Sequence, residues 1–137
     1  LQRQLFDRVE NTMETPKIKI MVVEDDEAAS IFIAEVLKME GFEPVVVNDS
    51  SKAMETAHAT LPECILLDLM MPPPDGFKLC RMLREDTTFQ STPILIVTAL
   101  DNTDSKIVAI GAGANDYLVK PFGIDDLISR VKRLLGE

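Results

Sequence analysis

Side chains with the chemistry of a metal site follow several apolar segments of this sequence. Each segment has the length of a buried strand, and acids, a hydroxyl and an amine come directly after four of them. Open α/β sheets hold their ligands beyond the carboxyl ends of the strands, so residues at these positions are expected to converge. The candidates are Glu24, Asp25 and Asp26 after the first segment, Asp68 after the third, Thr98 after the fourth and Lys120 after the fifth.

Carboxylates from two adjacent strands repel one another unless one keeps its proton or a cation joins them. Mg²⁺ prefers oxygen ligands and keeps several waters, so two or three carboxylates plus a phosphoryl oxygen suit it, with Mn²⁺ as an alternative. Next to such an ion, Asp68 could attack phosphorus while Lys120 offsets charge and Thr98 donates a hydrogen bond. The residues therefore predict a metal-dependent phosphoacceptor site centred on Asp68.

Taken one at a time, these residues also have structural explanations. An acidic run such as residues 24–27 is common at a helix N-terminus, where the helix dipole favours it. Thr98 could cap the next segment, and Lys120 before Pro121 could be a surface lysine at a turn. Their joint placement after successive apolar segments favours the functional interpretation.

The elements that must position these residues alternate along the chain. Apolar runs predict strands, amphipathic runs predict helices, and their alternation predicts an α/β fold with a doubly wound parallel sheet and helices on both faces. Pro44 begins the second strand and places it at an edge, which favours the flavodoxin-like order 2-1-3-4-5. The predicted strands span residues 18–23, 45–47, 64–67, 94–97 and 117–119, and the predicted helices span 28–39, 51–59, 77–84, 103–110 and 124–135.

Length and charge limit the classes of function. The 137 residues suit one domain, predicted at 17–137, and the net charge of -9 argues against direct nucleic-acid or membrane binding. No apolar run reaches the roughly 20 residues that span a bilayer, so we expect a cytoplasmic protein. Cys64 and Cys80 lie in apolar segments and are expected to be buried, reduced thiols.

Residues 1–16 differ from the rest of the chain. Leu1, Leu5, Val9 and Met13 recur every four residues in an otherwise polar stretch that ends at Pro16. Two interpretations stay open, a linker and the end of a signalling helix that joins an upstream domain.

From about Lys17 to Leu135 the sequence resembles the receiver domain of two-component response regulators. The resemblance rests on the acidic pair in VVEDDE, the segment LLDLMMPPPDGF, the VTA that ends the fourth strand, and GAGANDYLVKPF. Their order and intervals agree with that family. Pro73 followed by Pro74 departs from it, because the family often has a glycine there.

The resemblance implies a role for each matching residue. Asp68 would be the phosphoacceptor, Glu24 and Asp25 the metal-binding acids, and the main-chain carbonyl of Met70 a further metal ligand. Thr98 and Lys120 would contact the phosphoryl group, and the bond between Lys120 and Pro121 would be cis. Tyr117 would be the switch aromatic, although a half-buried strand tyrosine is equally compatible with its position.

The same resemblance implies how the signal is received and read. The phosphoryl donor would be a histidine kinase or a histidine phosphotransfer domain, and an output partner or domain would read the face formed by the fourth helix, fifth strand and fifth helix. A homodimer through that face is an alternative.

Met70 and Leu100 occupy the positions that tune dephosphorylation, and neither side chain can orient a water, so slow self-dephosphorylation is expected.

Other functions fit the sequence less well. A phosphatase that forms an aspartyl phosphate would need a general acid two residues after Asp68, where Met70 stands. An interaction module derived from a receiver would have lost an essential acid, and none is missing. His58 has no kinase-type motif around it, so it is interpreted as a surface histidine. The protein is therefore expected to catalyse only its own phosphorylation and dephosphorylation.

Overall fold

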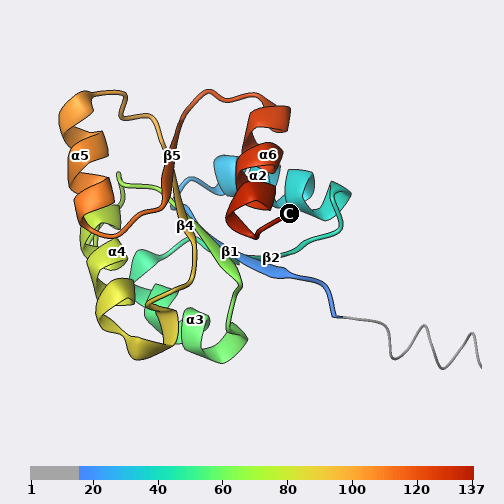
Figure 1. Ribbon diagram of the computed structural model, residues 1–137, viewed down its shortest axis with the longest axis horizontal. Coiled ribbons are helices and arrows are strands. Elements are labelled where there is room, and N and C mark those ends of the chain that lie inside the picture. Colours follow the sequence, from blue (N-terminus) through green and yellow to red (C-terminus); the bar gives the residue numbers. More distant parts are fainter. Residues whose placement is uncertain (1–15) are drawn as a thin grey trace, which may run out of the picture.

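The computed structural model describes residues 16–137, and a five-stranded parallel sheet lies at its centre (Figure 1). The strand order is β2-β1-β3-β4-β5, which confirms the predicted order. Because all four neighbouring pairs are parallel, the carboxyl ends of the strands lie along one edge of the sheet. The strands are β1 (Lys19–Val23), β2 (Glu43–Val47), β3 (Cys64–Leu67), β4 (Ile94–Thr98) and β5 (Asp116–Val119).

Composition explains the position of each strand in the sheet. Every residue of β3 and β4 is buried, as expected for strands covered on both faces. Strand β2 pairs only with β1 and keeps Glu43 and Val46 exposed. Pro44 lies within β2 opposite Ile20, so its prediction as an edge-strand proline is confirmed.

Helices cover the two faces of the sheet (Figure 1). Residues that alternate along the strands divide between the two cores: Ile20 and Val22 pack with one set of helices, Met21 and Val23 with the other. Helices α2 (Glu27–Met39) and α6 (Ile124–Leu134) cover the first face, and helices α3 (Ala53–Thr60), α4 (Gly76–Glu85) and α5 (Thr103–Gly111) cover the second.

The structure differs from the predicted elements mainly after β2. A short 3₁₀ helix, η1 (Ser50–Lys52), precedes α3, and a second, η2 (Thr87–Phe89), follows α4; neither was predicted. The other predicted boundaries agree to within one or two residues. The prediction for residues 1–16 falls almost wholly outside the residues that the structure describes.

Other predictions concern the core and the helices. Both Cys64 and Cys80 are buried free thiols, as predicted, and burial raises the pKa of Cys64 to about 12. Between residues 16 and 137, no helix is long and apolar enough to cross a membrane.

Candidate functional site

Three acidic side chains meet at the carboxyl edge of the sheet, between β1 and β3. Glu24 and Asp25 directly follow β1, and Asp68 directly follows β3. One carboxylate oxygen from each of the three lies within 4.8 Å of the others. Glu24 and Asp68 are buried whereas Asp25 is exposed, so solvent reaches the cluster on the Asp25 side. The structure thus brings together the three acids that the sequence predicted.

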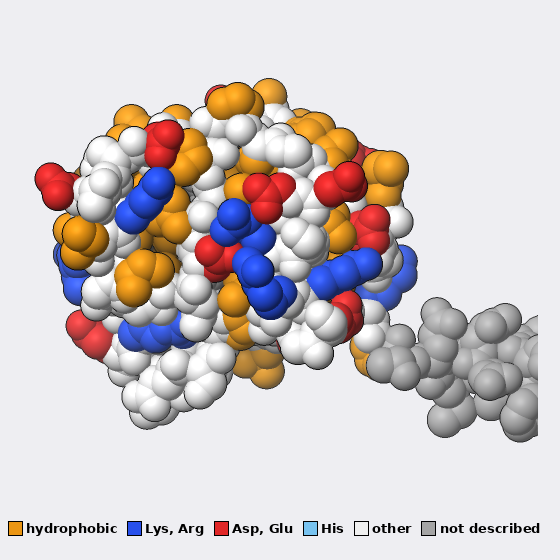
Figure 2. All heavy atoms as spheres, turned by 45° about the horizontal axis from the view of Figure 1, so that its top comes forward, with side chains coloured by type: hydrophobic (Ala, Val, Ile, Leu, Met, Phe, Trp, Pro, Cys, Tyr) orange, Lys and Arg blue, Asp and Glu red, His pale blue; other side chains and the backbone are white. Residues whose placement is uncertain are grey.

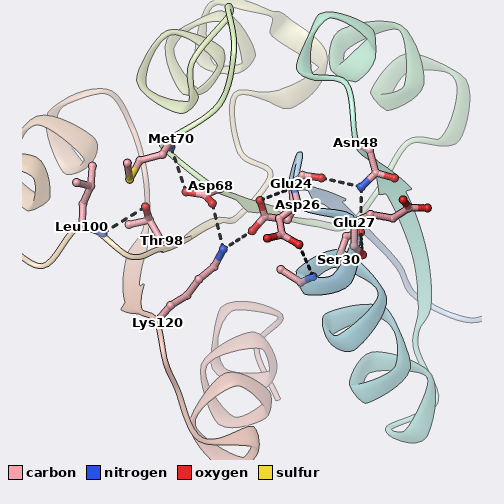
Figure 3. A network of polar contacts seen from close by, with 11 residues as sticks. Glu24, Asp26, Glu27, Ser30, Asn48, Asp68, Met70, Thr98, Leu100 and Lys120 are labelled. Carbon is pink, nitrogen blue, oxygen red and sulfur yellow. Dashed lines mark hydrogen bonds and ion pairs between the residues drawn. The ribbon is translucent and has the colours of Figure 1, made fainter.

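The neighbouring acid, Asp26, has a different position. Its side chain is the N-cap of α2 and accepts a hydrogen bond from the main-chain N–H of Ala29 at 3.1 Å (Figure 3). This cap satisfies one of the free N–H groups at the helix start. Asp26 is therefore accounted for by the helix, as the structural explanation of the acidic run proposed.

Asp68 accepts hydrogen bonds on both carboxylate oxygens. The main-chain N–H of Met70 donates to Oδ1 at 3.0 Å, and Lys120 Nζ donates to Oδ2 at 3.1 Å. Burial alone would raise the pKa of Asp68, but these two donors and the Thr98 hydroxyl together lower it. Asp68 is therefore held ionised, which is the state a nucleophilic carboxylate needs.

Lys120 connects the two buried acids. It comes directly after β5, and its ammonium contacts both Asp68 and Glu24 (Figure 3). Burial would lower the pKa of Lys120, but its hydrogen bonds to the two carboxylates raise it. The peptide bond between Lys120 and Pro121 is cis, which confirms that expectation. Lys120 thus carries a positive charge directly beside the acceptor carboxylate.

The chemistry of the three acids fits a hard divalent cation. Burial, the largest cause, raises the pKa of Glu24, and the neighbouring Asp68 charge raises it further in spite of Lys120. The Lys120 ammonium pairs with Glu24 and Asp68, and Asp25 adds a third carboxylate to the cluster, so the negative charge is only partly offset. Mg²⁺ is bound in proteins by such sets of carboxylate oxygens, together with waters. The acidic cluster could therefore hold a metal ion.

Thr98 and Tyr117 meet at the segment that follows β4. Thr98 is fully buried, and its Oγ1 accepts from the main-chain N–H of Leu100 at 3.5 Å. Tyr117 in β5 donates its hydroxyl to the carbonyl of the same residue, Leu100, at 2.7 Å. Its half-buried ring packs against the core beneath α5. Residue 100 thus touches both predicted switch residues.

Met70 lies beside Asp68 with its side chain extending toward Thr98, and Leu100 lies on the other side of Thr98 from Asp68 (Figure 3). The Met70 residue is 56% exposed, and Leu100 is half-buried against the core. Neither side chain carries a hydrogen-bonding group that could orient a water strongly.

Gly76 contributes to the site, although the sequence analysis did not single it out. A Cβ at this position would lie 2.1 Å from the main-chain oxygen of Asp68 and 2.6 Å from Leu69 Cα. The Gly76 N–H also donates to the Leu69 carbonyl at 3.1 Å. The start of α4 therefore packs directly on the acceptor backbone, and the Asp-Gly pair within PPPDGF is the sequence signal that could have indicated this.

His58 lies away from these residues, as its interpretation as a surface histidine proposed. It lies in the last turn of α3, its Nε2 lies 2.6 Å from Asp86 Oδ2, and its ring packs edge-on against Phe89. The two prolines beside the acceptor, Pro73 and Pro74, are joined by a cis peptide bond.

Comparison with known proteins identifies the class. The sequence model of the family described as the response regulator receiver domain matches residues 20–132 of this chain. The DNA-binding dual master transcriptional regulator RpaA of Synechocystis sp. is 38% identical over 117 residues, which are 85% of this chain and 48% of that protein. A putative response regulator from Chloroflexus aurantiacus has a TM-score of 0.85 at 32% identity, covering 89% of this chain and 100% of that one.

A structure of an activated relative is also similar. The BeF3-activated N-terminal receiver domain of RstA from Klebsiella pneumoniae has a TM-score of 0.82 at 34% identity, covering 87% of this chain and 99% of that one. The chain belongs to the receiver domain family of two-component response regulators, which signal by phosphorylation. It spans about half the length of the curated relatives that it matches.

Proposed function

We propose that this domain is a phosphorylation switch in which Asp68 accepts a phosphoryl group in the presence of Mg²⁺. The observation that carries the proposal is the position of the Asp68 carboxylate, which lies within the three-acid cluster and 3.1 Å from the Lys120 ammonium. This arrangement supplies both a nucleophile and the positive charge that phosphoryl transfer requires.

In the proposed reaction, a carboxylate oxygen of Asp68 attacks the phosphorus of a phosphohistidine. A P–O bond forms, the N–P bond breaks, and the histidine nitrogen leaves with the electron pair and takes up a proton. Lys120 and Thr98 contact the transferred oxygens. A divalent ion held by Glu24, Asp25 and Asp68, with the Met70 carbonyl as a further ligand, supplies additional charge neutralisation when bound.

The phosphoryl donor is proposed to be a histidine kinase or a histidine phosphotransfer domain. A cavity of about 540 Å³ adjoins the site and is lined by Ala29, Phe32 and Ile33 of α2 and by Lys120, Pro121 and Phe122 after β5. Because Lys120 belongs both to this cavity and to the site, a helix seated here would bring its histidine toward Asp68. The apolar lining gives such a helix a surface to bury.

The output surface is proposed to be the face formed by α5, β5 and α6. Tyr117 joins this face to the site through its hydrogen bond to Leu100, so movement of Thr98 toward a phosphoryl group would be felt there. Helix α5 exposes Ile107, Val108 and Ile110, which gives a partner an apolar surface.

A second copy of the chain is one partner that this face suits. Asp116 on β5 pairs with Arg130 and Arg133 on α6, so the face carries both charges beside its apolar residues and could be self-complementary. Figure 2 shows acidic and basic side chains intermingled on one face of the domain. The net charge of -9 supports the proposal that this segment does not bind nucleic acid directly. DNA binding is named for relatives such as RpaA, of which this chain covers about half.

Intact mass spectrometry tests the proposal. The protein is incubated with a small acyl phosphate, such as acetyl phosphate, with and without Mg²⁺. We expect one phosphoryl group on the wild type with Mg²⁺ and none on Asp68→Asn or after chelation. Absence of added mass on the folded wild type would falsify the proposed function.

A further inference from the structure

The junction between β2 and η1 contacts both loops that carry the acids of the site. It is defined as residues 48–50, which are the two residues that follow β2 and the first residue of η1. The loop after β1 holds Glu24 and Asp25, and the loop after β3 follows Asp68. No role has been given to the junction so far.

Asn48 holds the first of these loops (Figure 3). Its side-chain amide donates to the main-chain carbonyl of Glu24 at 2.7 Å and to the Ser30 hydroxyl at 2.9 Å. Ser30 is fully buried in α2 and donates in turn to the Glu27 carbonyl at 2.8 Å. An amide nitrogen has two hydrogens, so one bonds to the loop that presents the acids and the other to the first turns of α2 that follow this loop.

Ser50 holds the second loop. Its side chain is almost completely buried, and its hydroxyl donates to the Pro72 carbonyl at 2.8 Å. Pro72 lies four residues after Asp68, in the segment that leads to α4. Asn48 and Ser50 are separated by one residue, so one short segment contacts both loops.

We propose that Asn48 and Ser50 are positioning residues that fix the spacing between the two acid-bearing loops and so set the affinity of the site for a divalent cation. The inference rests on the proposed metal-dependent function. A metal site tolerates displacements of only about 0.5 Å in its ligands. Removal of a residue that hydrogen-bonds to a metal ligand and orients it typically weakens metal binding by roughly 10- to 100-fold.

The two hydrogen bonds from Asn48 set the size of the expected effect. The residue is exposed, so water can replace part of what its removal takes away. Net hydrogen bonds of about 0.5–1.5 kcal/mol correspond to roughly twofold to tenfold in an equilibrium constant. Ser50 makes one bond to the exposed Pro72 and should have the smaller effect.

Direct titration with Mn²⁺ tests the inference, with the free ion followed by electron paramagnetic resonance. The whole chain is compared as wild type, Asn48→Ala, Ser50→Ala and Ser51→Ala. Ser51 is the matched control, because it is exposed and its hydroxyl bonds only to Asp49 among residues 16–137. We expect the Kd for Mn²⁺ to rise about threefold to tenfold in Asn48→Ala, about twofold to threefold in Ser50→Ala, and not at all in the control.

Hydrogen exchange gives a second readout on the same proteins. Amides of residues 24–27 should exchange faster in Asn48→Ala, and amides of residues 69–71, which precede the three prolines, should exchange faster in Ser50→Ala. If Asn48→Ala does not fold, Asn48→Asp replaces it: this variant keeps the shape but loses the donors, and it should weaken Mn²⁺ binding despite its added negative charge.

Two results would overturn the inference: a Kd for Mn²⁺ that is unchanged in folded Asn48→Ala and Ser50→Ala, or an equal change in Ser51→Ala. Failure of the proposed function looks different. In that case the wild type binds Mn²⁺ but takes no phosphoryl group from the acyl phosphate, and the order of the Kd values still decides the role of the junction.

Discussion

Asp68 and Glu24 are adjacent buried carboxylates, and the fold moves their pKa values in opposite directions. Asp68 receives an amide, a hydroxyl and an ammonium, which together outweigh its burial and lower its pKa. Burial of Glu24 outweighs its hydrogen bonds from Lys120 and from the main-chain N–H of Asp26, so its pKa is raised. The acceptor is thereby kept ionised, whereas its neighbour favours a cation or a proton.

This difference predicts how Glu24→Gln changes stability. A carboxyl whose pKa is raised by folding stabilises the protein at low pH, and this contribution is lost as the pH rises through the folded-state pKa. At a pH above the folded-state pKa, the ionised Glu24 therefore opposes folding of the metal-free protein. We expect Glu24→Gln to raise Tm in the presence of a chelator, with a gain that shrinks as the pH falls toward the pKa of Glu24.

The same variant should lose the response to metal. Mg²⁺ should raise Tm of the wild type by binding the folded state, but it should not raise Tm of Glu24→Gln. Exposed Glu35 provides the control, and Glu35→Gln should respond to Mg²⁺ as the wild type does. A lower Tm for Glu24→Gln in chelator, or a retained response to Mg²⁺, would contradict this explanation.

Met70 is predicted to prolong the phosphorylated state. Its thioether cannot orient a water toward an acyl phosphate at Asp68, whereas an amide at the same position can. We expect Met70→Asn to increase the rate of dephosphorylation by roughly threefold to tenfold, below the ~10²-fold of a full general base. Decay of the phosphorylated mass after removal of the donor measures the rate. Met70→Leu is the control, and equal rates in wild type and Met70→Asn would refute the role.

At the scale of elements, the start of α4 supports the acceptor loop. Asp75 caps this helix by accepting from Lys78 N at 2.9 Å, and Gly76 allows the helix to contact the Asp68 backbone. A Cβ on Gly76 would have to displace main-chain atoms rather than a flexible side chain. The acceptor segment and the helix are thus one packed unit.

Gly76→Ala tests this packing. We expect the free energy of unfolding to fall by about 1–3 kcal/mol, because the new methyl group overpacks the backbone of Asp68. Gly111→Ala is the matched control, since a Cβ there would meet nothing within 4 Å and should leave stability equal or slightly higher. Urea denaturation measures both. Equal stability of Gly76→Ala and wild type would show that the loop adapts freely.

The sequence predicted the elements and the convergence of the main site residues, but not everything around them. Hydrophobic runs identify β3 and β4 because those strands are buried on both faces. The strand-end rule then locates Glu24, Asp25, Asp68, Thr98 and Lys120. Asn48 could not be found in this way, because it is an ordinary polar residue whose partners lie 18 and 24 residues away.

At the scale of the whole molecule, the site lies at one end of the sheet and the proposed output surface lies along its side. The link between them is short: Thr98 and Tyr117 both bond to the main chain of Leu100.

Sedimentation tests whether a second copy binds the α5 face. If the chain forms a homodimer there, phosphorylation should shift it from monomer toward dimer, and Ile107→Asp should prevent the shift by placing a charge in the apolar contact. Ile31→Asp is the control, because Ile31 is similarly exposed but lies on α2. A phosphorylated protein that stays monomeric would show that this face serves another partner.

Chemical trapping tests most directly whether the carboxylate of Asp68 accepts the phosphoryl group. Borohydride reduces an acyl phosphate of aspartate to homoserine, and peptide sequencing by mass spectrometry locates that residue. After treatment with Mg²⁺ and acetyl phosphate, the account predicts homoserine at position 68 and at no other acid. Homoserine at Asp25 or Asp75 instead, or at no position in a protein that has gained phosphoryl mass, would contradict it.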